Sequence, residues 1–303
     1  INRKALFMKL STSTNLVFER PDHTIFPMTE MMKIAKTAGF QEFDLNFYDW
    51  SLPHSPFLTD KWRSWIEEIA EEKERLGVSF GQCHAYTYNF LDPCMTSEEK
   101  ERHEMLVLRS LECSAIVGAT VCVTHPDTDF TAISQGKCSK EKNLEYFKRL
   151  IEKAGAFEME LAIENMCDIT IAPRRKYCAY PEELADLLDT LSDKRIGACW
   201  DFEHADIMQQ NQRQSLLLLK DHLKATHVSD THSATDPDLM YIKAFFRKID
   251  LLEGMETLKE INYQGSFSFE VNNYGNYFPD ELLPTALEFA YKIGQYLMEL
   301  GDK

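Results

Sequence analysis

Eight short runs, each nearly continuous in its apolar content and rich in β-branched or aromatic residues, recur along the whole sequence. Their first residues lie 28 to 43 positions apart. Such runs are typical of strands that are buried on both faces, as in a parallel sheet covered by helices. The runs are Ala5–Leu10, Glu42–Phe47, Val78–His84, Ala119–His125, Glu160–Glu164, Arg195–Asp201, Leu223–Val228 and Ser266–Val271.

The segments between these runs have helical periodicity and helix-boundary residues. Helices are expected to start at Thr59, at a capping box of Thr96 and Glu99, at Pro181 and at Pro279, and two of them to end at Gly77 and Gly118. Eight strand–helix units predict a single (β/α)8 TIM barrel, with residues 1–303 as one domain. An open doubly wound sheet is disfavoured because Ser11–Asn15, not a G-x-G-x-x-G motif, follows the first run.

The composition of the chain excludes several classes of protein. The 303 residues carry 33 Lys and Arg against 49 Asp and Glu, a net charge of −16, with 44% apolar residues. Such a chain has material for a large core and repels nucleic acid unless a local basic patch compensates. No apolar run reaches the length of a membrane span, and no secretion signal is visible. The eight cysteines form no C-x-x-C pair, so we expect reduced thiols in a cytoplasmic protein. The oligomeric state, including a homo-oligomer, is left open.

Ionisable side chains concentrate at the ends of the predicted strands, where the active sites of TIM barrels lie. Each taken alone is more often a hydrogen-bonded structural residue than a ligand. Several carboxylates converging on one barrel mouth would raise one another's pKa, and a divalent cation is the simplest way to keep them ionised. These residues are Asp44, His84, His125, Glu164, Asp201, His227 and Glu270.

Four of these residues come from neighbouring strands five to eight, so their side chains can meet at one point. They are Glu164, Asp201, His227 and Glu270. Imidazole and carboxylate ligands suit zinc, manganese, iron or cobalt. The expected substrate contacts are His84 and His125 on strands three and four, His204 and Asp230, each three residues past a ligand, and Arg174. Arg174 belongs to the only basic triplet and could bind a phosphate or carboxylate, although such a triplet is more often a solvated surface.

These residues carry a resemblance to a known superfamily. The segments Glu164-Asn165-Met166, Trp200–Asp206, His227–Asp230 and Phe269–Val271, together with Ala38–Asp44, resemble the sugar isomerase/epimerase superfamily with a xylose-isomerase-like TIM barrel, which includes endonuclease IV. The match spans essentially the whole chain. The resemblance implies that Glu164, Asp201, His227 and Glu270 bind one divalent metal, Mn²⁺ first, with Co²⁺, Zn²⁺, Mg²⁺ or Fe²⁺ as alternatives.

The resemblance also implies a mechanism. In ketose 3-epimerases the matching glutamates stand on opposite faces of the reacting carbon and exchange its proton through a cis-enediolate. Glu164 and Glu270 would thus be acid/base residues as well as ligands, and His204 would contact a substrate hydroxyl. The chemistry requires this arrangement, because a proton α to a carbonyl is weakly acidic and the developing oxyanion must be stabilised. We therefore expect a metal-dependent sugar, sugar phosphate or polyol isomerase or epimerase, with a small sugar as its partner.

The sequence departs from the family pattern after strand seven, where Phe245–Lys248 replaces glycines before Ile249-Asp250. A related lyase or dehydratase acting on a keto-sugar or keto-inositol is therefore an alternative. A nuclease resembling endonuclease IV is disfavoured because Asp230-Thr231-His232 stands too close to His227 and because the chain is acidic. A non-catalytic sugar-binding barrel is disfavoured because a pure binding site needs no pair of opposed glutamates.

Overall fold

Eight parallel strands close into a barrel in a computed structural model that describes residues 8–53, 55–168, 175–231 and 249–300. Each strand pairs with its neighbours in chain order, and β8 closes the barrel against β1. The prediction of a (β/α)8 TIM barrel is confirmed. The strands are β1 (Lys9–Ser13), β2 (Glu42–Asn46), β3 (Ser79–His84), β4 (Val121–Thr124), β5 (Glu160–Glu164), β6 (Ile196–Asp201), β7 (Leu223–Val228) and β8 (Ser266–Phe269).

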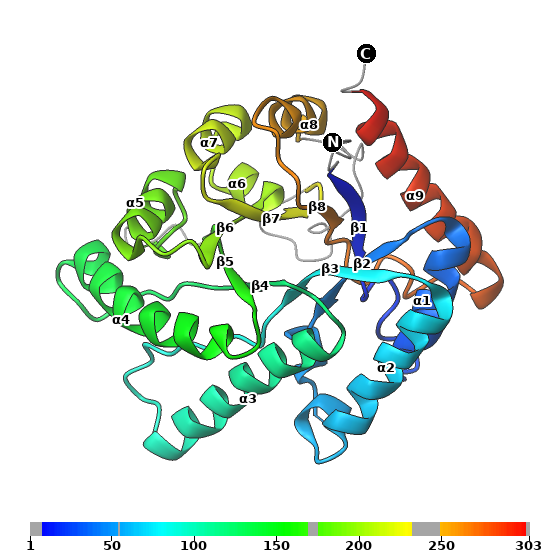
Figure 1. Cartoon of the computed structure of the whole chain (residues 1–303), viewed down its shortest axis with the longest axis horizontal. Coiled ribbons are helices and arrows are strands. Elements are labelled where there is room, and N and C mark those ends of the chain that lie inside the picture. The colour runs from blue at the N-terminus through cyan, green and yellow to red at the C-terminus, as the bar shows by residue number, and fades with distance from the viewer. Residues whose placement is uncertain (1–7, 54, 169–174, 232–248, 301–303) are drawn as a thin grey trace, which may run out of the picture.

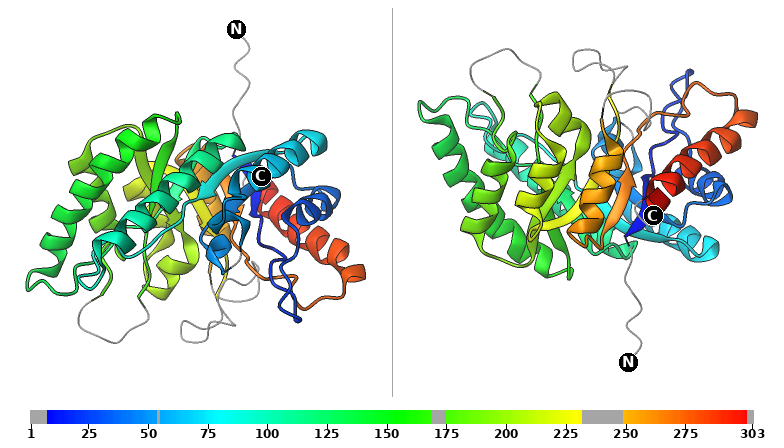
Figure 2. Two further views of the ribbon diagram at one scale, coloured as in Figure 1. Left: turned by 90° about the horizontal axis from the view of Figure 1, so that it is seen from below. Right: turned by 90° about the horizontal axis from the view of Figure 1, so that it is seen from above.

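Helices surround the barrel, as Figure 1 shows. Their apolar residues are buried in one core cluster with those of the strands. Figure 2 shows from two sides that the helices run alongside the strands. Within the described residues, no helix combines the length and apolarity that a membrane span requires. The helices are α1 (Met28–Ala38), α2 (Trp62–Leu76), α3 (Ser97–Ile116), α4 (Gln135–Gly155), α5 (Pro181–Leu191), α6 (Phe202–Ile207), α7 (Gln212–Leu219), α8 (Leu251–Glu260) and α9 (Leu283–Leu300), with 3-10 turns η1 (Asp49–Ser51), η2 (Pro56–Leu58) and η4 (Asp280–Leu282).

Most of the predicted helix boundaries are confirmed. The Thr96 side chain accepts from the Glu99 N–H and the Glu99 carboxylate accepts from the Thr96 N–H, which satisfies two exposed donors at the start of α3. Pro181 occupies the first turn of α5, and Gly77 ends α2 in a left-handed conformation. The prediction for Thr59 is wrong: its hydroxyl accepts from the Lys61 N–H in the turn before α2, which begins at Trp62.

The first strand starts later than the apolar run predicted. Residues 1–7 lie outside the described part of the chain, and β1 runs on through Ser11, Thr12 and Ser13, which the hydrophobic pattern had placed after the strand. Alternate residues of a barrel strand face the interior, and Ser13 donates there to Asn272 Oδ1. The barrel interior is polar on this side, so hydrophobicity alone could not mark the strand.

Candidate active site

Four potential metal ligands converge at the carboxyl ends of β5 to β8. Glu164 and Asp201 are the last residues of their strands, His227 is the penultimate residue of β7, and Glu270 directly follows β8. All four side chains are buried, and one ligand atom from each lies within 4.8 Å of the others. The strand register produces this convergence, because Asp201 lies directly opposite His227 in the β6–β7 pair.

Asp201 has one carboxylate oxygen in use and one available. Its Oδ1 accepts from the His204 N–H at 2.6 Å and so caps α6, while its backbone is fixed by two hydrogen bonds with the Asn165 side chain, at 2.6 and 3.0 Å. Its Oδ2 is buried and has no hydrogen-bond partner among the described residues. A buried carboxylate oxygen without a partner is costly unless a cation binds it. The four side chains therefore fit a divalent metal ion.

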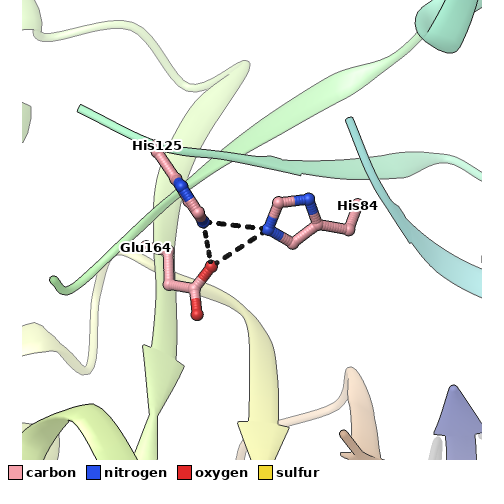
Figure 3. A group of neighbouring side chains, drawn as sticks. All are labelled: His84, His125 and Glu164. Carbon is pink, nitrogen blue, oxygen red and sulfur yellow. Dashed lines mark hydrogen bonds and ion pairs between the residues drawn. The ribbon is translucent and has the colours of Figure 1, made fainter. Parts of the chain in front are cut away.

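A second group of side chains meets at Glu164, as Figure 3 shows. Nε2 of His125 lies 2.9 Å from Glu164 Oε2 and 2.9 Å from Nε2 of His84. The Nδ1 atom of His84 is 2.9 Å from the Ala85 carbonyl oxygen, which can only accept, so His84 carries a proton on Nδ1. When His84 is neutral, its Nε2 is an acceptor, and His125 donates to both His84 and Glu164.

The two glutamates occupy opposite electrostatic environments. Burial alone would raise the pKa of Glu164, but the neighbouring His227 and His125 lower this pKa well below the ordinary value. Burial raises the pKa of Glu270 well above the ordinary value, and the charges of Glu164 and Asp201 add to the increase. Before a cation binds, the fold therefore stabilises the ionised form of one carboxyl group and the protonated form of the other.

The two groups of side chains border a cavity of about 330 Å³ at the barrel mouth. This volume is in the range of small-ligand sites. His84, His125 and His204, which were predicted as substrate contacts, all line the cavity. His204 lies on α6, with Nδ1 2.8 Å from the Asn165 carbonyl oxygen, and its pKa is raised well above the ordinary value because Asp201 and Cys167 outweigh the effect of burial.

Several residues of the cavity wall were not predicted from the sequence. Most of them follow β2, β5 and β8, where loops leave the barrel; a run of asparagines after the Glu270 strand was the one usable signal. Asn46 donates to Glu270 Oε1 at 3.2 Å, and burial raises the pKa of Asp49, which accepts from Asn15. The residues are Asn46, Tyr48, Asp49, Met166, Cys167, Asn272 and Asn273.

The other two predicted substrate contacts are placed differently. Asp230 is buried, and its Oδ1 accepts from the N–H groups of Thr231 at 2.8 Å and Ile249 at 3.2 Å. It does not border the described part of the cavity, so its contact with substrate stays a prediction. Arg174 lies outside the described residues. Of its two described neighbours in the triplet, Arg175 is paired with Glu183 on α5 and Lys176 lines the cavity.

The sequence matches one family model, described as xylose isomerase-like TIM barrel, over residues 32–293. The chain belongs to this family. A comparison with curated proteins finds no match. This xylose isomerase-like barrel is also similar to many solved structures at low sequence identity.

Three of these structures indicate the range of the similarity. A D-tagatose 3-epimerase-like protein is 20% identical, with a TM-score of 0.73 over 97% of this chain and 98% of its own. The 3-keto-D-glucoside 4-epimerase of E. coli is 16% identical, with a TM-score of 0.70 over 95% and 99%. An L-ribulose 3-epimerase is 11% identical, with a TM-score of 0.73 over 98% and 96%. At these identities the structures show a shared fold.

Proposed function

We propose that this protein is a divalent-metal-dependent sugar isomerase or epimerase that works by proton transfer between glutamates. One observation carries the proposal: Glu164, Asp201, His227 and Glu270 bring their ligand atoms within 4.8 Å of one another beside a cavity of monosaccharide-binding size. The sugar epimerases among the similar structures support the substrate class. The proposal extends to polyols and also to sugar phosphates, because Lys176 in the cavity wall offers a cation to a phosphate group.

The proposed chemistry needs a base and an acid at one carbon. The divalent metal, when bound, would polarise the substrate carbonyl and stabilise the oxyanion. Glu164 removes the proton α to the carbonyl, and Glu270 returns a proton to the enediolate, or the two exchange roles in the reverse reaction. Asn46 Nδ2 holds Glu270 at Oε1, which leaves Oε2 for the metal or the proton. The Nε2 acceptor of His84 can orient a substrate hydroxyl.

The ligand set favours Mn²⁺ among the divalent metals. Three carboxylates and one imidazole form a site dominated by hard oxygen atoms, which suits Mn²⁺ and Mg²⁺. Zinc and copper are selected by softer ligands such as thiolates. Co²⁺, Zn²⁺ and Fe²⁺ also accept mixed imidazole and carboxylate ligands. Metal analysis of protein purified without chelator would identify the ion.

The test is a panel of ketoses, keto-inositols and oxidised glycosides incubated in deuterated water with Mn²⁺. We expect deuterium at one carbon of one substrate, and loss of this exchange in Glu164→Gln and Glu270→Gln with the fold retained. Glu160→Gln is the matched control, because Glu160 begins the same strand as Glu164 and pairs at its far end with Lys224. A Glu270→Gln variant with the parent's exchange rate would refute the mechanism.

The same panel separates a related lyase or dehydratase, which would eliminate water or an aglycone from a keto-sugar after the same proton abstraction. A non-catalytic barrel would bind sugar without exchange, and would gain no stability from Mn²⁺ or Co²⁺. These outcomes leave the fold unchanged and replace only the reaction.

One observation favours a second candidate, a nuclease. His84, His125 and Glu164 form a further group of three potential ligands, so Glu164 could bridge two metal ions, as metal-dependent phosphodiesterases require. The net charge of −16 opposes this candidate, since binding to DNA relies on neutralising phosphates. Two metal ions per chain together with cleavage of an abasic-site duplex would favour the nuclease over the isomerase.

A further inference from the structure

Three inward-facing residues of β2 form a column inside the barrel. They are Glu42, Asp44 and Asn46, which face the same side because alternate residues of a strand do so. Glu42 lies at the base and accepts from Lys9 Nζ at 2.9 Å, whereas Asn46 lies at the top and donates to Glu270. Asp44 lies between them, one layer below the proposed metal ligands.

The Asp44 carboxylate is directed at the underside of His227. Its Oδ2 lies 3.2 Å from His227 Nε2, and it accepts from Gln82 Nε2 at 2.7 Å and from Ser268 Oγ at 3.1 Å. All four side chains are buried. A register shift in the β2–β3 pair, between Phe43 and Asp44, sets Asp44 opposite Gln82. Bulges of this kind commonly re-aim side chains beside active sites.

Packing does not require a carboxylate at this level. The interiors of TIM barrels are usually filled by layers of branched apolar side chains. Within the described residues the barrel also holds an apolar cluster of Val123, Ala162, Cys199 and Ala225, with no ionisable carboxylate among them. Burying an acid instead is costly unless it has partners, and Asp44 Oδ1 has no hydrogen-bond partner in the described structure. A functional requirement accounts for Asp44 better than core packing does.

The other ring nitrogen of His227 faces the proposed ligands. Its Nδ1 lies 3.1 Å from Glu164 Oε1 and 3.2 Å from Glu270 Oε2. An imidazole that donates its Nε2–H to a carboxylate keeps its lone pair on Nδ1, which is the form that binds a metal. We propose that Asp44 is a positioning residue, which fixes the tautomer and ring orientation of His227 so that Nδ1 is presented to the divalent cation. This role rests on the proposed metal-dependent function.

The test measures metal affinity, not turnover. Mn²⁺ is titrated by calorimetry into the chelator-treated parent chain, Asp44→Asn and Glu42→Gln. We expect Asp44→Asn to bind Mn²⁺ about 10- to 100-fold more weakly. Glu42→Gln is the matched control, because Glu42 is a buried carboxylate two residues earlier on the same strand and contacts no proposed ligand. We expect it to bind Mn²⁺ as the parent does.

The outcomes separate this role from the proposed function. A parent chain that binds neither Mn²⁺ nor Co²⁺ would overturn the metal centre, and the role of Asp44 with it. A parent chain that binds metal no more tightly than Asp44→Asn would overturn the role of Asp44 alone, as would an equal loss in Glu42→Gln.

A second measurement covers the case in which Asp44→Asn fails to fold. Nitrogen-15 NMR of the histidine rings in the parent chain, with diamagnetic Zn²⁺ bound, reports the tautomer of His227 directly. We expect the proton on Nε2, where it is donated to Asp44, and the metal on Nδ1. A proton on Nδ1 in the metal-bound protein would overturn the proposal.

Discussion

Replacing Asp201 with asparagine should make the metal-free protein more stable and the metal-loaded protein less so. Asparagine keeps an oxygen that can accept from the His204 N–H, so the cap of α6 is retained. It replaces the buried Oδ2, which has no hydrogen-bond partner among the described residues and lies 4.0 Å from His204 Nδ1, with an amide that can donate to the surrounding carboxylates. An unsatisfied buried group costs about 1–3 kcal/mol, and a charged one more. We therefore expect the metal-free free energy of unfolding to rise by about 1–3 kcal/mol.

Metal should reverse the order of stability. A metal ion present at 100 times its dissociation constant stabilises the folded state by about 2.7 kcal/mol. Asp201→Asn removes one of the four side chains that would coordinate the ion, so it should lose most of this stabilisation. The assay is urea unfolding with EDTA and again with Mn²⁺. Burial raises the pKa of Asp201, so the folded state disfavours its charged form. The metal-free difference between the proteins should be largest near neutral pH and shrink as pH falls towards the ordinary aspartate value of 3.8.

Asp193→Asn is the control for this experiment. Asp193 precedes the same strand at its other end, and its hydrogen bonds to Arg195 lower its pKa to about 2. We expect this substitution to lower stability slightly and to leave the Mn²⁺ increment intact. A metal-free Asp201→Asn protein that is less stable than the parent, or one that keeps the full Mn²⁺ increment, would refute the reasoning.

Three further predictions follow from the structure. Asn165→Ala removes two buried hydrogen bonds at the end of β6 and should lower the free energy of unfolding in urea by about 1–3 kcal/mol. Asp129→Asn should cost about 1.5–3 kcal/mol at neutral pH, because Lys142 and Thr131 lower the pKa of Asp129 to about 2. The difference should shrink as pH falls from about 4 and be lost below about 2, where the parent protonates too. Gly81→Ala should destabilise by about 1–3 kcal/mol, because its Cβ would lie 2.2 Å from a serine oxygen in the barrel interior.

Each of these three has an outcome that contradicts it. Gly136→Ala, with nothing within 4 Å of an added Cβ on α4, should instead stabilise by about 0.5–1 kcal/mol; equal effects at the two glycines would contradict the packing argument. A pH-independent loss in Asp129→Asn would show that its ion pair is not the cause. An Asn165→Ala protein as stable as the parent would mean that water replaces the amide.

The fold was predictable from the sequence because the strands are buried by helices. The bounds of β5 and β7 match the apolar runs residue for residue, and the convergence of Glu164, Asp201 and Glu270 follows from strand order alone. That residues 1–303 form one domain stays a prediction.

The remaining features of the fold and the site could not be predicted from the sequence, for physical reasons. The polar residues of β1 do not show the apolar pattern of a buried strand, and the cavity residues of the connecting loops, such as Asn273, follow no periodic pattern. Asp201-x-x-His204 is a capping motif as well as a site motif, and only geometry reveals that its two carboxylate oxygens are used differently. The unusual segment after β7, Phe245–Lys248, lies outside the described residues.

The bulge in β3 changes the register between β2 and β3 part-way along the strand, so the facing of residues at the barrel mouth does not follow from their facing at the base. Phe43 pairs with Phe80 and Asp44 with Gln82, so Gly81 is the extra residue. Below it the strand keeps the alternation of the barrel base; above it the alternation is reset, which turns His84 inwards. If the strand kept Gly81 but lost the bulge, every later residue would shift by one position, Cys83 would stand where the imidazole does and His84 would point at the helices. Gly81, as the extra residue of the bulge, thus determines which side chains of β3 face the site.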